Sequence, residues 1–474
     1  MKIGVNLNGM NFDYKAIINP NTLLWGVSIG ACICFILLIL IGVPVQYSAL
    51  YVEPIIYILF LNLFIKPRFI IGLGTSALIF MYFVKLCILP ISTVLGDFTT
   101  IVASSIYNEY WNEACFYIAV EWVIVSFSVR IIGGHYLNKI SRLKSNDSES
   151  YSKKHDKEIM TFKNHPVYYL ALGLFLGILT LLIIINSNLL SAIFFIWEME
   201  EDTVAAGGGP VWFMFKNFIV WAQPLFFFWI TVKIYNSKFR VGKFFTLLCL
   251  AFFSSIIMTE YRILSLIIGV TIFGFTIGKF NKFRIMSKIL KIITGVFLLL
   301  TIYMLTTHGD DMNQTYANLG RLLDIYCGGF LVAAASCSVH MDDGILMFIF
   351  DTVSANPLSH LIFGDIPTTT DVINSALNAS AKGIFYELMV QAKDFFGVFS
   401  PIAVGLCIFF LMKMDFYTST EDVDLYRLFY IFCAVSVALF MVMYTYSMVT
   451  NFIIYKCLVW LIVIAVDRHV RIKA

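Results

Sequence analysis

Two arginines are the residues of this chain best suited to bind a phosphorylated ligand. Arg262 ends the segment Thr259–Arg262, which is the whole connection between two long apolar runs. Arg321 opens the stretch Arg-Leu-Leu-Asp-Ile-Tyr-Cys-Gly-Gly in a later, more polar segment. A guanidinium group holds phosphate oxygens through two parallel hydrogen bonds and does not lose its charge. The pair therefore predicts a pyrophosphate-binding site; the simpler alternative for Arg262 is an ion pair with its neighbour Glu260.

A reaction at such a site also needs a general base, and the candidates lie between residues 308 and 397. Asp394 is the first choice, because Lys393–Gly397 is predicted to open an apolar run and so to hold a carboxylate on a rigid helix at the water interface. The structural alternative is that Asp394 only caps that helix. His360 is the second choice. Further candidates in this region are His308, His340, Asp324, Asp371 and Glu387.

Composition identifies the solvent around the elements that must position these residues. The chain has 474 residues, of which 59% are hydrophobic and 13% are charged, and its mean hydropathy is +0.84. Soluble domains carry about twice this fraction of charge, so a water-soluble fold is excluded. The net charge of +3 is too small and too dispersed to indicate a nucleic-acid partner. We expect one all-α integral membrane domain, residues 1–474, in contact with the lipid bilayer.

Apolar runs of about twenty residues recur along the chain and are long enough to cross a membrane as helices. The first, Leu23–Val43, has no small-residue cleavage site and is expected to span rather than to be removed. We expect about twelve transmembrane helices. Their centres lie near Phe35, Ile58, Phe80, Val123, Leu176, Val220, Leu250, Gly269, Phe297, Ala403, Ser436 and Leu461.

Positive charge alternates between successive connections, and this alternation predicts the topology. Lysine and arginine are concentrated in one set of connections, which includes residues 134–166, 233–243 and 279–291. The other set is acidic and includes the cluster Glu198–Asp202. We therefore expect the basic set in the cytoplasm, together with both termini, as an even number of spans requires.

Two connections are longer than the others. Residues 134–166 contain the charged, serine-rich sequence SRLKSNDSESYSKKHDKE and are predicted to form a flexible cytoplasmic loop. Residues 308–392 mix apolar stretches with Asp, Asn and Thr. This mixture predicts a large extracytoplasmic loop whose short helices pack on, or dip into, the outer membrane face and form part of the active site. No residue spacing typical of a metal site is present, so neither a metal nor a cofactor is expected.

Lysines also occur inside the predicted spans. Lys85 lies near the middle of the third apolar run, and Lys456 lies in the outer third of the last one. A charge at the centre of a bilayer costs at least about 2.5 to 3.5 kcal/mol. We therefore expect each lysine either to extend toward the interface or to form an ion pair.

These features together resemble the Wzy-type polymerases of O-antigen and capsular oligosaccharide repeat units. The resemblance rests on about twelve spans, a large outer loop late in the chain, and Arg262 at the outer mouth of a middle span. The loop closes with the Asn/Ser/Ala-rich run Asn374–Ser380 and with the Asp-Phe-Phe-Gly sequence Asp394–Gly397. It opens with an Arg-x-x-x-x-Tyr-x-Gly-Gly-like stretch made by Arg321, Tyr326, Gly328 and Gly329.

The resemblance implies a metal-independent glycosyltransferase of the bacterial cytoplasmic membrane. It would transfer a growing glycan from undecaprenyl pyrophosphate to the terminal sugar of a new lipid-linked repeat unit, at the outer face of the membrane. The partners implied are this undecaprenyl-pyrophosphate-linked oligosaccharide and a chain-length regulator protein. The catalytic residues implied are Asp394 or His360 as the base, with Arg262 and Arg321 on the leaving group. The substrate-binding residues implied are Arg262, Arg321, Tyr326, Gly328, Gly329 and Tyr386, the two tyrosines stacking on sugar rings.

Two other functions remain open on the sequence. A lipid-linked oligosaccharide flippase or another transporter would carry functional charges through the centres of its spans rather than at the outer mouth. An O-antigen ligase would share the topology of a polymerase and differ only in the acceptor.

Overall fold

The computed structural model describes most of the chain in separate segments. The described residues are 19–95, 109–146, 165–190, 201–237, 242–256, 262–280, 327, 329–339, 344–355, 368–369, 371–372, 387–420 and 425–473. Every regular element in these segments is a helix, and they contain no strand. The expected all-α fold is confirmed.

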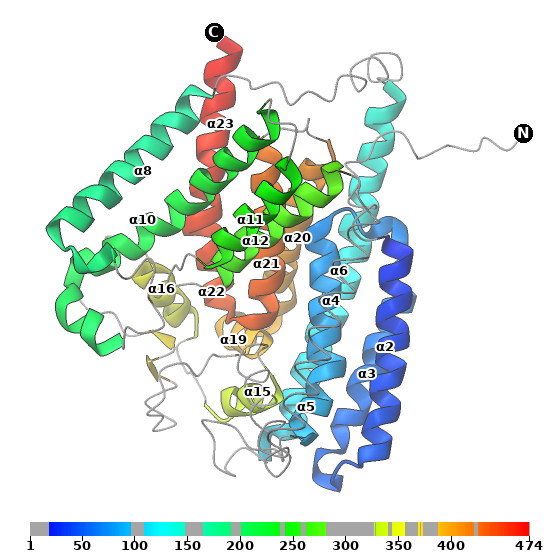
Figure 1. Ribbon diagram of the computed structural model, residues 1–474. Coiled ribbons are helices and arrows are strands. Elements are labelled where there is room, and N and C mark those ends of the chain that lie inside the picture. Colours follow the sequence, from blue (N-terminus) through cyan, green and yellow to red (C-terminus); the bar gives the residue numbers. More distant parts are fainter. Residues whose placement is uncertain are drawn as a thin grey trace, which may run out of the picture.

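The first group of helices runs from one end of the molecule to the other (Figure 1). Its elements are α2 (Pro20–Ile41), η2 (Val45–Tyr51), α3 (Val52–Phe64), η3 (Pro67–Phe69), α4 (Leu73–Phe83), η4 (Val84–Ile88), α5 (Leu89–Leu95) and α6 (Trp111–Asn146). Asn19 begins α2 by accepting a hydrogen bond from the backbone N–H of Asn21 at 3.0 Å, and Pro20 occupies the first helical position. α6 continues to Asn146, so the predicted loop 134–166 begins as helix, and residues 147–164 lie outside the described segments.

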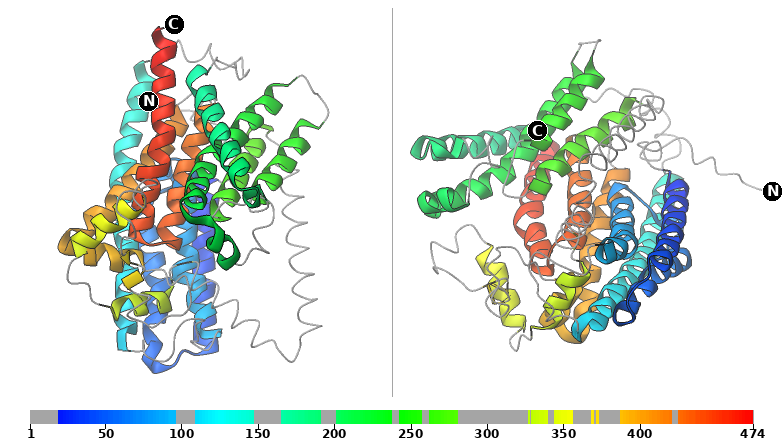
Figure 2. Two further views of the ribbon diagram at one scale, coloured as in Figure 1. Left: turned by 90° about the vertical axis from the view of Figure 1, so that its left-hand side faces the viewer. Right: turned by 60° about the horizontal axis from the view of Figure 1, so that its bottom comes forward.

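The remaining helices complete the bundle. The middle of the chain forms α8 (Pro166–Ile185), α10 (Glu201–Asn236), α11 (Lys243–Ile256) and α12 (Arg262–Phe280). The last part forms α15 (Phe330–Cys337), α16 (Gly344–Ser354), α19 (Leu388–Phe396), η7 (Gly397–Phe399), α20 (Ser400–Thr420), α21 (Leu425–Met443), α22 (Tyr446–Asn451), η8 (Phe452–Cys457) and α23 (Leu458–Lys473). α8 packs on α10 and α23, and both α8 and α10 are inclined away from the other helices (Figures 1 and 2).

Nine helical segments among the described residues are long and apolar enough to cross a membrane. They contain all of the predicted span centres except Leu250, Gly269 and Phe297. Leu250 and Gly269 fall on the shorter apolar helices Lys243–Ile256 and Ile263–Ile277, and Phe297 lies outside the described residues. The chain is thus a multi-pass membrane protein.

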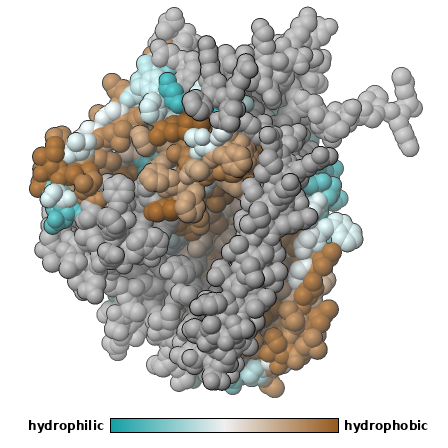
Figure 3. Space-filling model, viewed as in Figure 1, coloured by the Kyte–Doolittle hydropathy of each residue, from teal (hydrophilic) through white to brown (hydrophobic). Residues whose placement is uncertain are grey.

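Burial separates the central helix from the peripheral ones. In the most apolar stretch of 18 residues in α21, 94% of the residues are buried, whereas 28% are buried in the corresponding stretches of α2 and α8. α21 contacts α4, α10, α12 and α20, whereas apolar residues such as Leu40 of α2 and Ile184 of α8 are 75% and 73% exposed. Figure 3 shows such apolar surface over α2 and α3, at the lower right of the view. Lipid is the solvent that suits this surface.

The ends of the helices give the molecule two distinct poles. The C-terminal ends of α6 and α23 lie at the upper pole in Figure 1, and α15 lies at the lower one, here called the α15 end. Asp415 of α20 caps α4 by accepting hydrogen bonds from the backbone N–H groups of Gly74 at 3.0 Å and Thr75 at 2.7 Å. Gly72 leaves no room for a Cβ beside this carboxylate. This contact fixes the start of α4, whose other end carries the candidate site.

Candidate functional site

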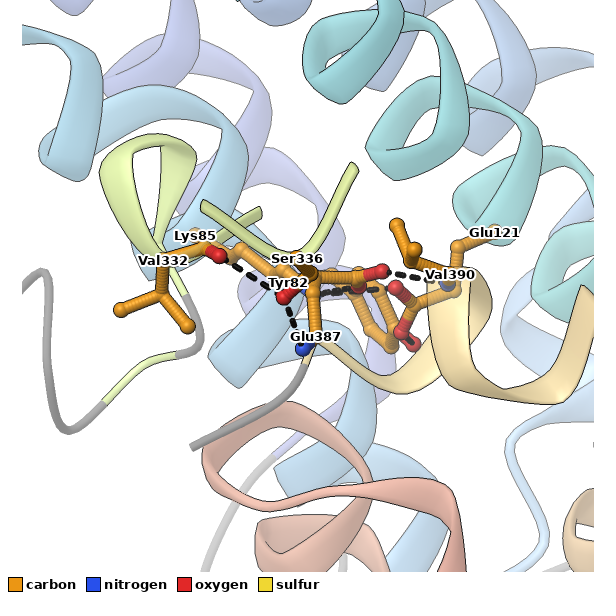
Figure 4. Close-up of polar contacts among 7 residues, drawn as sticks. All are labelled: Tyr82, Lys85, Glu121, Val332, Ser336, Glu387 and Val390. Carbon is orange, nitrogen blue, oxygen red and sulfur yellow. Dashed lines mark hydrogen bonds and ion pairs between the residues drawn. The ribbon is translucent and has the colours of Figure 1, made fainter. Parts of the chain in front are cut away.

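A lysine and two glutamates meet inside the helical bundle. Lys85 Nζ lies 2.9 Å from Glu121 Oε2 and 2.9 Å from Glu387 Oε1, and all three side chains are fully buried. Lys85 belongs to the π-helical turn η4, Glu121 to α6, and Glu387 immediately precedes α19 (Figure 4). The ion pair expected for Lys85 is confirmed. We call Lys85, Glu121 and Glu387 the buried charge cluster.

Hydrogen bonds connect the buried charge cluster to α15 and α19 (Figure 4). Tyr82 OH donates to Glu121 Oε1. The backbone N–H of Glu387 donates to Ser336 Oγ of α15 at 3.1 Å. Glu387 Oε2 accepts from the backbone N–H of Val390 at 2.9 Å and so caps α19. The helices of the predicted outer loop are therefore fixed to the interior of the bundle.

Aromatic rings enclose the cluster on the side of α3 and α6. The rings of Tyr57 and Trp122 stack with their centres 4.8 Å apart. The centre of the Tyr82 ring lies 5.2 Å from that of Trp122. Trp122 and Tyr82 are fully buried. Charges surrounded by such side chains interact more strongly than charges in water, and an unpaired one would cost correspondingly more.

The second lysine inside a span occupies a similar local structure. Lys456 lies on the π-helical turn η8, is 6% exposed, and donates a hydrogen bond to Asn217 Oδ1. Its Nζ also lies 5.0 Å from the centre of the Trp221 ring. Short π-helical turns often mark functional sites in helices. Both lysines that are buried among the described residues, Lys85 and Lys456, are thus on π-helical turns.

α19 leads from the buried charge cluster to a partly exposed ion pair. Lys393 Nζ lies 3.5 Å from Asp394 Oδ1, and the two side chains are 35% and 9% exposed. Lys393 Nζ also lies 5.4 Å from the centre of the Tyr117 ring on α6. The backbone carbonyl of Asp394 packs directly on Gly344, the first residue of α16. Asp394 is therefore held next to α16, with a small part of its carboxylate exposed.

α16 has a buried carboxylate of its own. Asp351 accepts hydrogen bonds from the backbone N–H of Thr369 at 2.7 Å and from Thr369 Oγ1 at 2.6 Å. Burial raises the pKa of Asp351, and these hydrogen bonds oppose the rise. The backbone carbonyl of Asp351 accepts from the amide of Asn451 at 3.0 Å. These contacts tie α16 to α22.

The structure describes only some of the residues that the sequence places in the site. Gly329 is the N-cap of α15, and Arg262 is the first residue of α12. The predicted site residues outside the described segments are Arg321, Tyr326, Gly328, His360 and Tyr386.

The predicted position of Asp394 at the start of a helix is wrong. α19 already begins at Leu388, and Asp394 lies in its last turn. The next helix, α20, starts at Ser400 after a break at Gly397, whose φ is +54°. The sequence does not reveal this break, because apolar residues lie directly on both sides of Gly397. N-capping of a span, the structural alternative for Asp394, is thereby excluded.

Sequence reasoning did not single out Glu121. The signal was present, because Glu121 is an acidic residue inside an apolar run that follows the run containing Lys85. Opposite charges inside neighbouring spans are expected to pair. Glu387 was one of several candidate bases, and its ion pair and capping hydrogen bond instead give it a positioning role.

Comparisons with protein-family models, with curated proteins and with solved structures find no match. In the part of the chain that the structure describes, no group of three or more His, Cys, Asp or Glu side chains is arranged to hold a metal ion.

Proposed function

We propose that this protein polymerises oligosaccharide repeat units carried on undecaprenyl pyrophosphate, at the outer face of the bacterial cytoplasmic membrane. The proposed topology has about twelve spans, with both termini in the cytoplasm and residues 308–392 outside. The observation that best supports the proposal is that α15 and α19 are anchored in the bundle by Glu387, while Lys393 and Asp394 stay partly exposed. A lipid-linked sugar has its pyrophosphate at the membrane surface, so its enzyme needs polar residues fixed to the spans at that depth.

The proposed reaction transfers a glycan between two lipid-linked molecules. Asp394 accepts the proton of the acceptor hydroxyl, which attacks the anomeric carbon of the donor as the lipid pyrophosphate leaves. Arg262 and Arg321 bind the leaving group, and preorganised donors of this kind each contribute roughly 3 to 4 kcal/mol in the transition state. The position of Arg262 at the first residue of α12 supports this role, because helix N-termini favour phosphate groups. His360 is the alternative base.

The proposal predicts polymerisation without any other enzyme. The purified protein in detergent, given only repeat units linked to lipid pyrophosphate, should form a ladder of longer lipid-linked glycans. No nucleotide sugar is needed, because donor and acceptor are the same molecule. Gel electrophoresis of the products measures the ladder. Substrate that stays unchanged under these conditions would contradict the proposal.

Variants assign the roles in the same assay. Asp394→Asn should slow ladder formation by roughly 10²- to 10⁴-fold, the usual contribution of a general base, without lowering thermal stability. Arg262→Ala and Arg321→Ala should each abolish long chains, and Arg→Lys should restore them only in part, because the two-pronged hydrogen bonding is lost. Exposed Glu109, just before α6, provides a control, since Glu109→Gln should leave the ladder unchanged. A near-normal rate in Asp394→Asn would move the base to His360.

A transporter of lipid-linked oligosaccharides is the second candidate, and one observation favours it. Lys85, Glu121 and Lys456 lie buried inside the spans, where transporters carry functional charges. In proteoliposomes a transporter would move the lipid-linked substrate between leaflets and leave its chain length unchanged. The length of the product therefore distinguishes the two functions.

A further inference from the structure

A third glutamate belongs with the buried charge cluster. Glu53 of α3 is 1% exposed, and its Oε2 has no hydrogen-bond partner among the described residues. Lys85 is the oppositely charged group with which Glu53 interacts. Among the described residues, Lys85 contacts two buried carboxyl groups directly, those of Glu121 and Glu387, and acts on the third, that of Glu53, through its charge.

The three carboxyl groups cannot all be ionised at once, because Lys85 supplies only one positive charge. The group would then hold one positive and three negative charges away from water, and a buried charge without a partner costs several kcal/mol. The carboxyl groups of Glu121 and Glu387 lie 2.9 Å from the same Lys85 Nζ, so their ionised forms would repel each other at short range. Charge balance therefore requires bound protons.

In the described part of the chain, no unpaired positive charge near the cluster removes this requirement. Lys393, which acts on Cys337, is paired with Asp394. The other groups are a phenol and several thiols, which are neutral at neutral pH. They lie on α4, η4, α6, α15 and α20, and are Tyr82, Cys87, Cys115, Cys337 and Cys407.

α6 connects this region with the α15 end of the molecule. Glu113, Tyr117 and Glu121 are spaced by four residues and share one face of the helix. Glu113 is exposed, Tyr117 is half-buried and Glu121 is fully buried. Polar groups thus extend along one helix face from water to the cluster.

We propose that Glu53, Lys85, Glu121 and Glu387 form a proton-binding site inside the membrane domain, and that this site exchanges protons with water at the α15 end. Binding moves a proton from hydronium to a carboxylate oxygen and leaves a water molecule. The Lys85–Glu387 ion pair that anchors α19 can persist while Glu121 and Glu53 carry the protons. The site is thus a proton store next to the outer segment.

Infrared spectroscopy of the full-length protein in lipid nanodiscs tests this proposal. At neutral pH the wild-type protein should show the carbonyl band of a protonated carboxylic acid, and the band should shift when H₂O is exchanged for D₂O. Glu53→Gln and Glu121→Gln should each reduce the band. The exposed matched control, Glu109→Gln, should leave it unchanged.

Three results would overturn the proposal. They are the absence of the band in the wild-type protein, its failure to shift in D₂O, and a band of full intensity in both Glu53→Gln and Glu121→Gln. The first two need no variant, so a variant that fails to fold does not prevent the test. The measurement uses no glycan substrate, and its outcome is therefore independent of whether the protein is a polymerase.

Discussion

Lys85 is the side chain on which the electrostatics of the bundle interior depend. Its Nζ lies 2.9 Å from both Glu121 and Glu387 and balances one negative charge, and none of the three side chains is exposed. Replacing it with the uncharged Met leaves two carboxyl groups without their cation, and breaking a buried ion pair in this way costs about 3 to 5 kcal/mol. We therefore expect Lys85→Met to lower the thermal unfolding midpoint in detergent substantially, as measured by heating followed by size-exclusion chromatography.

A combined variant separates loss of charge balance from loss of packing. Lys85→Met together with Glu121→Gln and Glu387→Gln removes the cation and both carboxyl groups, so it should be more stable than Lys85→Met alone. Lys233 of α10 is exposed and serves as the control, since Lys233→Met should change the midpoint little. If the single and the combined variant unfold at the same temperature, the interaction with the two glutamates does not explain the loss.

The sequence predicts part of this chemistry. An ion pair for Lys85 follows from the cost of a charge in lipid, a cost that depends only on the residue type and on the apolar run around it. The identity of Glu387 as a partner does not follow, because it is 302 residues away and reaches Lys85 only when α19 enters the bundle. The break at Gly397 also does not follow from the sequence. It puts Asp394 at the end of one helix rather than at the start of another.

At the scale of elements, the contact between α16 and α19 sets the position of Asp394. A Cβ on Gly344 would overlap the backbone carbonyl of Asp394, and a backbone group cannot move aside as a flexible side chain can. We therefore expect Gly344→Ala to displace α16 from α19, to lower the thermal midpoint and to reduce ladder formation. The thermal assay and the ladder assay measure the two effects.

Gly26 of α2 provides the matched control for Gly344. Nothing lies within 4 Å of a Cβ placed there, and alanine is the better helix former, so Gly26→Ala should be neutral or slightly stabilising. A Gly344→Ala variant as stable and as active as Gly26→Ala would show that the close contact is unimportant.

The spans were more predictable than the helices of the outer segment. Long apolar runs must be helical in lipid, because the backbone can satisfy its hydrogen bonds in no other local way. α19 has only nine residues, and its start is fixed by the capping Glu387 and by Ser336, which lies 51 residues earlier. Such short helices depend on tertiary contacts, and hydropathy alone does not reveal those.

At the scale of the whole molecule, the positions of the helix ends can be compared with the topology that we propose. The alternation of lysine and arginine predicts that Arg142 and the C-terminus are cytoplasmic. In the structure the C-terminal ends of α6 and α23 lie at one pole and α15 lies at the other (Figure 1).

Reporter fusions after Arg142 and Ala474 should therefore give cytoplasmic signals, and a fusion near Asp343, between α15 and α16, should report the outside. A cytoplasmic signal from Asp343 would put Asp394 on the side where outer-face lipid-linked glycans are absent, and the polymerase proposal would fail with it.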